Sequence, residues 1–257
     1  MAIYSKSVRA LMKEAMSAAL ASAEGAIFSK QQAIDWFAKN YPKIKTGTVT
    51  AHLIRLSTNA PSRTHYSAKP GEDDVFFQVD GSHFRLYQPA NDPSPIYTAP
   101  AATDATQKTQ DEGQDEDVAA EGTGQFAYET DLRNYLAKNL SLLEPGLRLY
   151  EDEGITGIEF PVGGRFIDIL ALDSTGALVV IELKVSRGYD RVIGQLMRYI
   201  AWIRENQADT GQQVRGIIVA REISEDLFLA CSLLPDVRLY EYQLSLSLKQ
   251  VQRAQRA

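Results

Sequence analysis

Two long apolar runs joined by a glycine-containing loop constrain the fold of this 257-residue chain more than any other feature. Residues 165–173 and 177–185 are rich in β-branched and aliphatic side chains, and Ser174-Thr175-Gly176 separates them. The glycine supplies the left-handed residue that a three-residue hairpin loop needs. Because both runs are apolar on both faces, we expect central strands of a sheet covered on each side. Helix and strand patterns alternate afterwards, which predicts an α/β domain with a mixed central sheet.

Three charged residues interrupt these apolar runs: Asp168, Glu182 and Lys184. The predicted hairpin places Asp168 directly opposite Glu182, and directly paired residues share a face of the sheet. Side chains alternate along a strand, so Lys184 lies on the same face. Burying two carboxylates and an ammonium costs several kcal/mol. A structural salt-bridge cluster is one explanation, but it needs only one acid per lysine, so the surplus carboxylate favours a bound Mg²⁺ or Mn²⁺.

A divalent cation beside a lysine is typical of sites that hydrolyse phosphodiesters, because both groups stabilise negative charge that develops on phosphate. A further acid belongs to the helix predicted over residues 126–140, whose apolar stripe is Leu132, Leu136 and Leu140. Glu129 falls on this stripe, where an uncompensated carboxylate is costly. Glu129 is therefore either a site residue or an acid favoured by the dipole of the first helical turn.

An acidic segment divides the chain. Four of the ten prolines lie between residues 89 and 100, and residues 99–123 carry seven acids and one lysine. Their net charge of −6 equals that of the whole chain, so the remaining parts are neutral together and do not exclude a nucleic-acid partner. We expect a flexible linker, with an acidic partner-binding segment as the alternative. The predicted parts are residues 1–90, the linker 91–124, a second domain at 125–248 and a tail at 249–257.

The first domain shows three helical patterns followed by strand-like alternation. Ser29 and Gln32 form a capping-box pattern before the second helix, and the third helix begins near Thr46. Asp80-Gly81 then separates two alternating runs, which predicts a hairpin. Three helices followed by a hairpin are typical of a winged helix-turn-helix, an α+β fold whose third helix enters the major groove.

The third helix has a polar stripe opposite its apolar one. The stripe contains Thr48, His52 and Arg55, and Lys43 and Lys45 precede the helix. We expect these five residues to contact DNA bases and phosphates. Winged helices also bind proteins, and a polar helix face is often merely solvated, so these alternatives stay open.

Cysteine content and hydropathy indicate the cellular compartment that the sequence predicts. The single cysteine, Cys231, excludes a disulfide framework and is expected in the core of a late helix. No window approaches the 18 consecutive apolar residues of a membrane span. The sequence therefore predicts a cytoplasmic protein without a membrane partner.

Asp168 and the triplet Glu182-Leu183-Lys184 resemble the D…ExK signature of the PD-(D/E)xK nucleases, and residues 125–245 are similar to their NucS (EndoMS) branch. The resemblance implies a restriction-endonuclease-like fold in which Asp168 and Glu182 bind a divalent metal, assisted by the Leu183 carbonyl and Glu129. Lys184 would act on the attacking water. The resemblance also implies roles for residues that hold the lysine, substrate or DNA backbone: Gln195, Tyr199, Arg165 and Arg187.

The first domain departs from that family. NucS enzymes carry an N-terminal β-rich domain that pairs subunits, whereas this chain shows a winged-helix pattern. Mismatch specificity is therefore not implied, and a homodimer is left open. The sequence predicts a metal-dependent endodeoxyribonuclease for repair or restriction-type defence, acting on duplex or branched DNA. A non-catalytic DNA-binding regulator with a nuclease-like scaffold is the alternative, and an RNA or flap substrate is also open.

Overall fold

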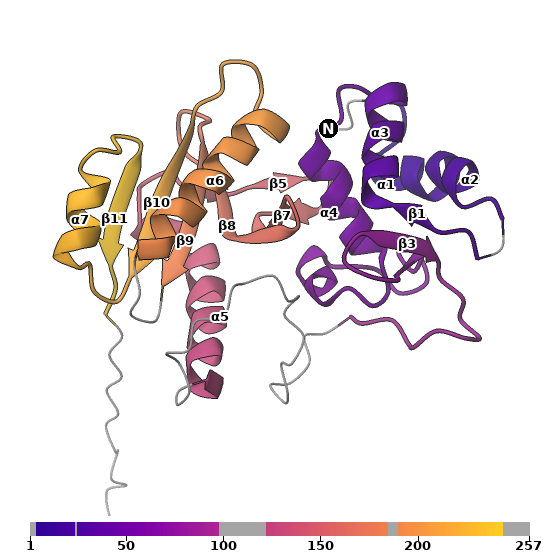
Figure 1. The fold of residues 1–257 in the computed structure, drawn as a ribbon, viewed down its shortest axis with the longest axis horizontal. Coiled ribbons are helices and arrows are strands. Elements are labelled where there is room, and N and C mark those ends of the chain that lie inside the picture. The colour runs from indigo at the N-terminus through magenta and orange to yellow at the C-terminus, as the bar shows by residue number, and fades with distance from the viewer. Residues whose placement is uncertain (1–3, 24, 98–121, 185–189, 244–257) are drawn as a thin grey trace, which may run out of the picture.

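The computed structural model describes residues 4–23, 25–97, 122–184 and 190–243. These residues form an N-terminal unit of helices with a small sheet and a C-terminal unit built on a larger mixed sheet (Figure 1). Among them, no helix is long and apolar enough to cross a membrane. The predicted tail at 249–257 and Arg187 lie outside the described residues.

The N-terminal unit contains three helical segments, a short 3-10 helix and a three-stranded antiparallel sheet of order β1-β3-β2. Its elements are α1 (Val8–Leu11), the π-helical η1 (Met12–Met16), α2 (Ser17–Leu20), β1 (Phe28–Ser29), α3 (Lys30–Asn40), α4 (Thr46–Leu56), the 3-10 helix η2 (Pro61–Tyr66), β2 (Phe76–Gln78) and β3 (His83–Leu86). The segments α1, η1 and α2 follow one another directly, so they form the first helical stretch. The order of three helices and a hairpin is the one that the sequence predicts.

Local side-chain contacts fix these elements. Ser29 Oγ accepts a hydrogen bond from the Gln32 amide at 3.1 Å, and Gln32 Oε1 accepts one from the Ser29 amide at 2.7 Å, so the predicted capping box is present. In the hairpin, Asp80 Oδ1 accepts from the amides of Ser82 and His83 at 2.7 and 2.9 Å. These bonds satisfy backbone donors that the strands leave unpaired.

The C-terminal unit contains a mixed sheet with helices on both faces. The main sheet has the order β11-β10-β9-β8-β4, and β7 also pairs with β8. β9, β10 and β11 are parallel, whereas β8 is antiparallel to β9, β4 and β7. The elements are α5 (Gly122–Lys138), the 3-10 helix η3 (Leu140–Leu142), β4 (Arg148–Leu149), β5 (Glu151–Asp152), β6 (Ile155–Thr156), β7 (Ile158–Val162), β8 (Arg165–Leu172), β9 (Leu178–Lys184), α6 (Asp190–Asn206), β10 (Val214–Ala220), α7 (Glu225–Cys231) and β11 (Val237–Glu241).

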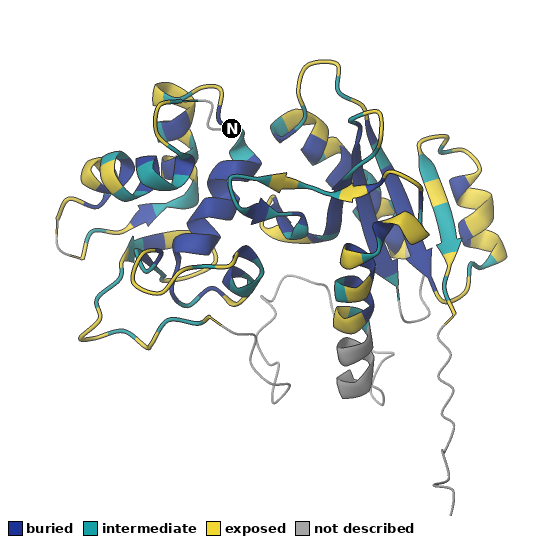
Figure 2. Ribbon diagram, turned by 180° about the vertical axis from the view of Figure 1, so that it is seen from behind, coloured by how far each residue is buried: buried dark blue, intermediate teal, exposed yellow. Residues whose placement is uncertain are grey.

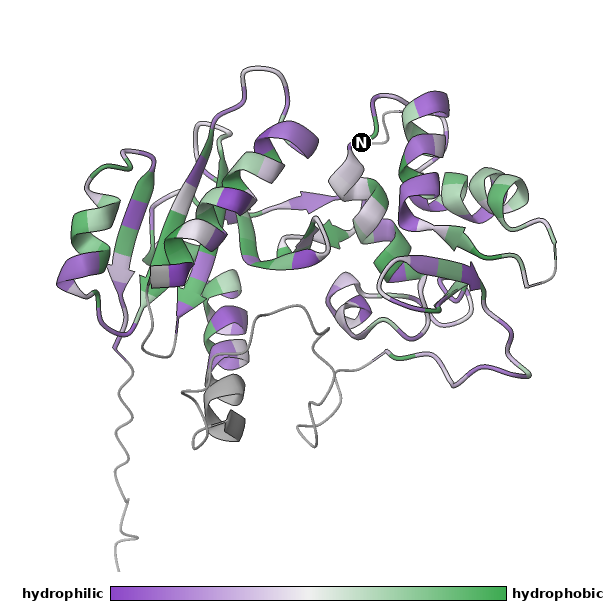
Figure 3. Ribbon diagram, viewed as in Figure 1, coloured by the Kyte–Doolittle hydropathy of each residue, from purple (hydrophilic) through white to green (hydrophobic). Residues whose placement is uncertain are grey.

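The central hairpin is covered on both faces, as predicted. Leu178 and Val180 of β9 lie in one buried cluster with residues of α6, whereas Val179 and Ile181 lie in another with Leu132 and other residues of α5. Figure 2 shows the buried strands between the helices, and Figure 3 shows that hydrophobic residues follow them. Alternation along β9 therefore sends its apolar residues into two cores. Cys231 is buried, also as predicted.

The two units share a core, which the sequence did not predict. Ala51 and Ile54 of α4 belong to the same buried cluster as Phe160 of β7 (Figure 1). Gly47 permits the close approach, because a Cβ at that position would lie 2.3 Å from Gln207 Oε1 and 3.0 Å from the Phe160 ring. The N-terminal unit is therefore docked on the mixed sheet as well as connected through the acidic segment.

The predicted linker at 91–124 is only partly within the described residues, because residues 98–121 are not described. Before them, the Ile96 amide donates to the Thr58 carbonyl at 2.8 Å, and Arg63 lies over the Tyr97 ring. The first residues of this segment thus pack on the N-terminal unit. After the undescribed stretch, α5 begins at Gly122, two residues before the predicted end of the linker.

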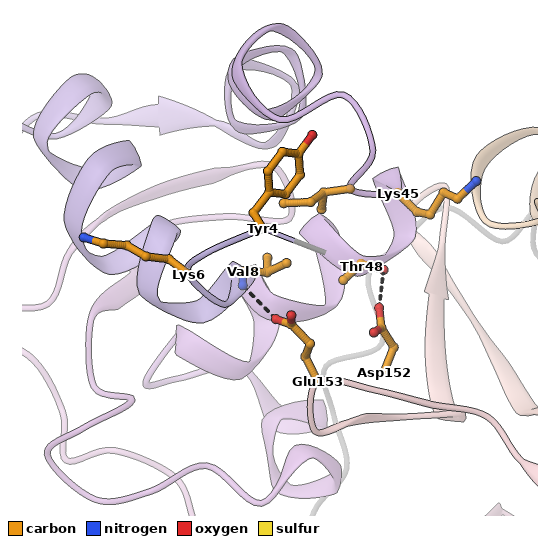
Figure 4. Close-up of a pocket in the computed structure, with 8 residues that line it drawn as sticks. Tyr4, Lys6, Val8, Lys45, Thr48, Asp152 and Glu153 are labelled. Atoms are coloured by element: carbon orange, nitrogen blue, oxygen red, sulfur yellow. Dashed lines mark hydrogen bonds between the residues drawn. The ribbon is translucent and has the colours of Figure 1, made fainter. Parts of the chain in front are cut away.

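A small cavity lies at the junction of the two units (Figure 4). Two hydrogen bonds cross the junction beside it. The Val8 amide donates to Glu153 Oε2 at 2.7 Å, and Thr48 Oγ1 donates to Asp152 Oδ2 at 3.0 Å. Carboxylates of β5 and of the turn that follows it therefore satisfy polar groups of the N-terminal unit, including an amide in the first turn of α1.

Candidate active site

The three charged residues of the hairpin lie together. The observed register pairs Ile169 with Ile181 and Leu170 with Val180, which confirms the predicted pairing of the two strands. One position beyond these pairs, Asp168 Oδ2 accepts a hydrogen bond from the Leu183 amide at 2.9 Å. On β9, Lys184 Nζ donates to Glu182 Oε1 at 2.9 Å.

Burial and mutual repulsion perturb the two carboxyl groups. The Glu182 side chain is 2% exposed, and burial together with the nearby Asp168 charge raises its pKa. Burial also raises the pKa of Asp168, and the charge of Glu129 acts in the same direction. For Lys184, burial alone would lower the pKa, but the charge and hydrogen bond of Glu182 together with the charges of Asp168 and Glu129 raise it. The lysine is therefore protonated and compensates only part of the carboxylate charge.

One oxygen of this cluster has no protein partner. Glu182 Oε2 is buried and, among the described residues, accepts no hydrogen bond. An unpaired buried carboxylate oxygen is costly, and carboxylate oxygens are the ligands that Mg²⁺ and Mn²⁺ prefer. Asp168 and Glu182 therefore fit a divalent cation. Within the described parts of the chain, no group of three or more His, Cys, Asp or Glu side chains is placed to hold an ion, so Glu129 does not complete a third carboxylate ligand.

Helix α6 brings two more of the expected residues to the site. Gln195 Nε2 donates to Tyr199 Oη at 3.1 Å, as their spacing of one helical turn allows. Burial raises the pKa of Tyr199, and the charges of Glu182 and Asp168 add to this shift. The phenol therefore lies within electrostatic reach of both carboxylates, on the face of the sheet that α6 covers.

The predicted exposure of the polar stripe on α4 is wrong. Thr48, His52 and Arg55 are 3%, 0% and 7% exposed. Thr48 and Arg55 contact the C-terminal unit, whereas the charged neighbours of His52 belong to the N-terminal unit. Gln207 Nε2 donates to Thr48 Oγ1 at 3.3 Å, and Arg55 donates to the Gly154 carbonyl at 3.1 Å. The stripe consequently cannot enter a DNA groove in this arrangement.

The other predicted DNA contacts differ in accessibility. Lys45 is held at the junction, where its Nζ lies 3.0 Å from Asp209 Oδ1. Lys43 and Arg165 are exposed. The structure therefore separates these residues into one that joins the two units and two that are open to solvent.

Two charged residues beside the site were missed by the sequence analysis. Arg133 of α5 is buried one helical turn after Glu129, and its Nη1 lies 2.6 Å from Glu159 Oε1 of β7. The spacing of four residues from Glu129 was the available signal for Arg133. For Glu159, the signal was a single acid inside the apolar strand Ile158–Val162.

The central hairpin of the mixed sheet presents an aspartate, a glutamate and a lysine beside a Gln-x3-Tyr helix, an arrangement that is consistent with the PD-(D/E)xK resemblance. In agreement, residues 128–244 match the family described as "Endonuclease NucS C-terminal domain". The C-terminal unit is thus similar to the C-terminal domain of NucS endonucleases. Residues 7–86 match a separate family, described as "Domain of unknown function (DUF7669)".

Two relatives match about two fifths of this chain, and the chain spans about a third of their length. The chain is 33% identical over 100 residues to Endonuclease NucS of Methanopyrus kandleri, and 36% identical over 97 residues to Endonuclease NucS 2 of Halobacterium salinarum. These matches cover 39% and 38% of this chain, but only 35% of each relative. The chain is also similar to the solved structure of an EndoMS–dsDNA2 complex, with 26% identity, a TM-score of 0.38 and coverage of 51% of this chain and 50% of that one.

Proposed function

We propose that this chain is a divalent-metal-dependent DNA endonuclease that hydrolyses phosphodiester bonds at the Asp168–Glu182–Lys184 cluster. The observation that carries the proposal is the buried Glu182 Oε2, which lies beside a second carboxylate and has no hydrogen-bond partner among the residues that the structure describes. A cation bound there would supply positive charge against the negative charge that builds up on the scissile phosphate. The matching relatives are named as endonucleases, which supports this reaction class.

Each residue has a distinct role in this proposal. Asp168 and Glu182 hold the cation together with the Leu183 carbonyl, and Glu129 adds negative charge nearby. Lys184 is fixed by Glu182 and donates a hydrogen bond to the attacking water or to a phosphate oxygen. Gln195 and Tyr199 line the side of the site covered by α6 and position substrate there.

The N-terminal unit is proposed to be of the winged-helix type. Its element order and the sheet order β1-β3-β2 support this assignment. Since the polar stripe of α4 is buried, DNA contact falls to exposed basic residues such as Lys43 and Arg165. The biological context, repair or restriction-type defence, follows from which DNA is cut.

A cleavage panel tests the proposed activity. Purified protein with Mg²⁺ or Mn²⁺ is incubated with duplex, mismatched, single-stranded and branched DNA. We expect cutting of at least one substrate, and we expect Glu182→Ala and Lys184→Ala to abolish it while DNA binding persists. Intact DNA in every reaction would refute the proposal.

The rival function is a non-catalytic DNA-binding regulator on a nuclease-like scaffold. One observation favours it, because the described residues gather no third His, Cys or acidic ligand at the site. A divalent-cation titration separates the two functions. The regulator predicts no rise in melting temperature on addition of Mg²⁺ or Mn²⁺, whereas the nuclease predicts a rise.

A further inference from the structure

Glu159 lies beside the proposed catalytic strand in an unusual backbone conformation. The β7–β8 ladder pairs Ile158 with Ile169 and Phe160 with Ile167, so Glu159 stands across from Asp168. The φ angle of Glu159 is 47°, in the left-handed region that favours glycine. A non-glycine residue there costs on the order of 1 kcal/mol or more, so surrounding contacts must hold it.

The N-terminal unit supplies those contacts from one short element, η2. Ser62 Oγ donates to Glu159 Oε2 at 2.8 Å, and His65 Nε2 lies 3.2 Å from the same oxygen. Tyr66 Oη donates to the Glu159 main-chain carbonyl at 3.0 Å. Both the side chain and the backbone of Glu159 are therefore fixed by the docked unit.

On its other side, Glu159 holds Arg133 of α5. The Arg133 side chain is 9% exposed, and its Nε has no hydrogen-bond partner among the described residues. Burial alone would raise the pKa of Glu159, but the hydrogen bonds from His65 and Ser62 together with the charges of Arg133 and His65 lower it to about 2. The Glu159 carboxylate thus pairs with a buried guanidinium that favours its charged form.

Arg133 also lies within electrostatic reach of the candidate cation site. Its charge acts on Asp168, and it follows Glu129 by one turn on the same helix. A guanidinium forms strong paired hydrogen bonds with carboxylates. If Glu159 did not hold it, Arg133 would pair with Asp168 or Glu129 and compete with a divalent cation for their oxygens.

We propose that Glu159 is a positioning residue that keeps Arg133 off the cation-binding carboxylates, so that the docked N-terminal unit controls how tightly the site binds a divalent cation. This inference rests on the proposed function, because it presupposes the cation site. It gives the N-terminal unit a role in the chemistry that is independent of any DNA contact.

Calorimetric titration of the full chain with Mn²⁺, without DNA, tests the inference. We expect Glu159→Gln to weaken Mn²⁺ binding about tenfold, the effect of one charge-assisted hydrogen bond transferred to a competitor. The double variant Glu159→Gln with Arg133→Gln should bind Mn²⁺ at least as tightly as the unsubstituted chain, because the competitor is gone. A merely structural role for the pair predicts no recovery in the double variant.

A matched control and a milder variant complete the design. Glu144→Gln removes a similarly buried acid that pairs with Arg215 at 2.6 Å, at the opposite end of the sheet, and should leave Mn²⁺ binding unchanged. Ser62→Ala with His65→Ala leaves the Glu159–Arg133 pair in place and loosens it only from the N-terminal side. This double variant should weaken Mn²⁺ binding about threefold, which is less than the tenfold loss expected for Glu159→Gln.

The outcomes separate the two proposals. Unchanged Mn²⁺ binding in Glu159→Gln, or binding still weak in the double variant, overturns the positioning role. Unchanged binding in the Ser62→Ala, His65→Ala variant overturns control by the N-terminal unit, and circular dichroism checks that each variant is folded. If the unsubstituted chain binds no Mn²⁺, the proposed cation site itself fails.

Discussion

Two sets of polar side chains are buried in this protein, and they differ in how their charges are compensated. On α4, Thr48 and Arg55 each have hydrogen-bond partners in the C-terminal unit, and His52 stays neutral because burial lowers its pKa to about 3. On β8 and β9, the carboxyl groups of Asp168 and Glu182 repel each other, and burial and that repulsion raise the pKa of Glu182. The first set joins two surfaces, whereas the second has an excess of negative charge.

Burial of a polar group alone therefore does not identify a site. His52 and Glu182 both contain buried atoms that have no hydrogen-bond partner within the described parts of the chain. His52 can stay neutral by not binding a proton, and its neighbour Arg55 disfavours the charged form further. Glu182 is a carboxylate beside another carboxylate, so a cation relieves both. The excess of like charge distinguishes the binding site from the interface.

The largest expected effect is on cleavage and tests the charged cluster. Because Lys184 donates a hydrogen bond to Glu182 and supplies positive charge beside the two carboxyl groups, Lys184→Ala should lower the cleavage rate by about a thousandfold or more. The rate constant is measured by gel assay under single-turnover conditions. Lys138→Ala, at an exposed lysine near the end of α5, is the control and should cut normally. Equal rates in both variants would remove Lys184 from the mechanism.

The next effect tests the interface. In Gly47→Val, the new side chain meets Gln207 and the Phe160 ring, and the free energy of unfolding should fall by about 3 kcal/mol. Urea denaturation measures the loss. Gly81→Ala is the matched control, because nothing lies within 4 Å of its added Cβ. If Gly47→Val unfolds like the control, the two units are not docked as described.

A third effect tests the excess of negative charge. The pKa of Asp168 is raised from 3.8 to about 6 in the fold, so the free-energy penalty of ionising this buried group is small near pH 4, grows up to about pH 6 and is complete at pH 8. In metal-free buffer, Asp168→Asn should therefore raise the free energy of unfolding by about 2 kcal/mol at pH 8 and by little at pH 4. Denaturant unfolding at the two pH values measures the difference. A destabilised variant at pH 8 would show that the cluster is a balanced salt bridge.

The smallest effect tests His52. Its pKa is lowered in the fold, so the unfolded chain binds a proton below about pH 6.5 that the folded chain does not, and stability falls as the pH drops. His52→Leu removes this loss and should gain about 1 kcal/mol at pH 5.5 relative to pH 7.5. Stability is followed by denaturation at both pH values.

The same His52→Leu variant decides whether the stripe of α4 contacts DNA. Fluorescence anisotropy with labelled duplex should give unchanged affinity, because His52 is 0% exposed. A marked loss of affinity would mean that α4 leaves the interface to reach DNA, and the comparison between the two buried sets would then fail.

The sequence predicted the hairpin site because strand geometry leaves few choices. A fixed alternation of side chains and a loop of known length place Asp168, Glu182 and Lys184 on one face, whatever packs around them. The polar stripe of α4 was predicted correctly as a stripe and wrongly as exposed. A helical pattern shows which residues share a face, but it does not reveal what covers that face.

The residues of the sequence by themselves determined the local order: the capping box at Ser29, the mixed-sheet hairpin and the gathering of two acids and a lysine. Only the tertiary structure decided that α4 packs on β7 through Gly47 and that Glu159 joins Arg133 to the N-terminal unit. The physical reason is the range of the contacts. Helix and strand patterns are set by backbone geometry that repeats over a few residues. The docking of two units depends instead on the shapes of surfaces formed by residues far apart in the chain.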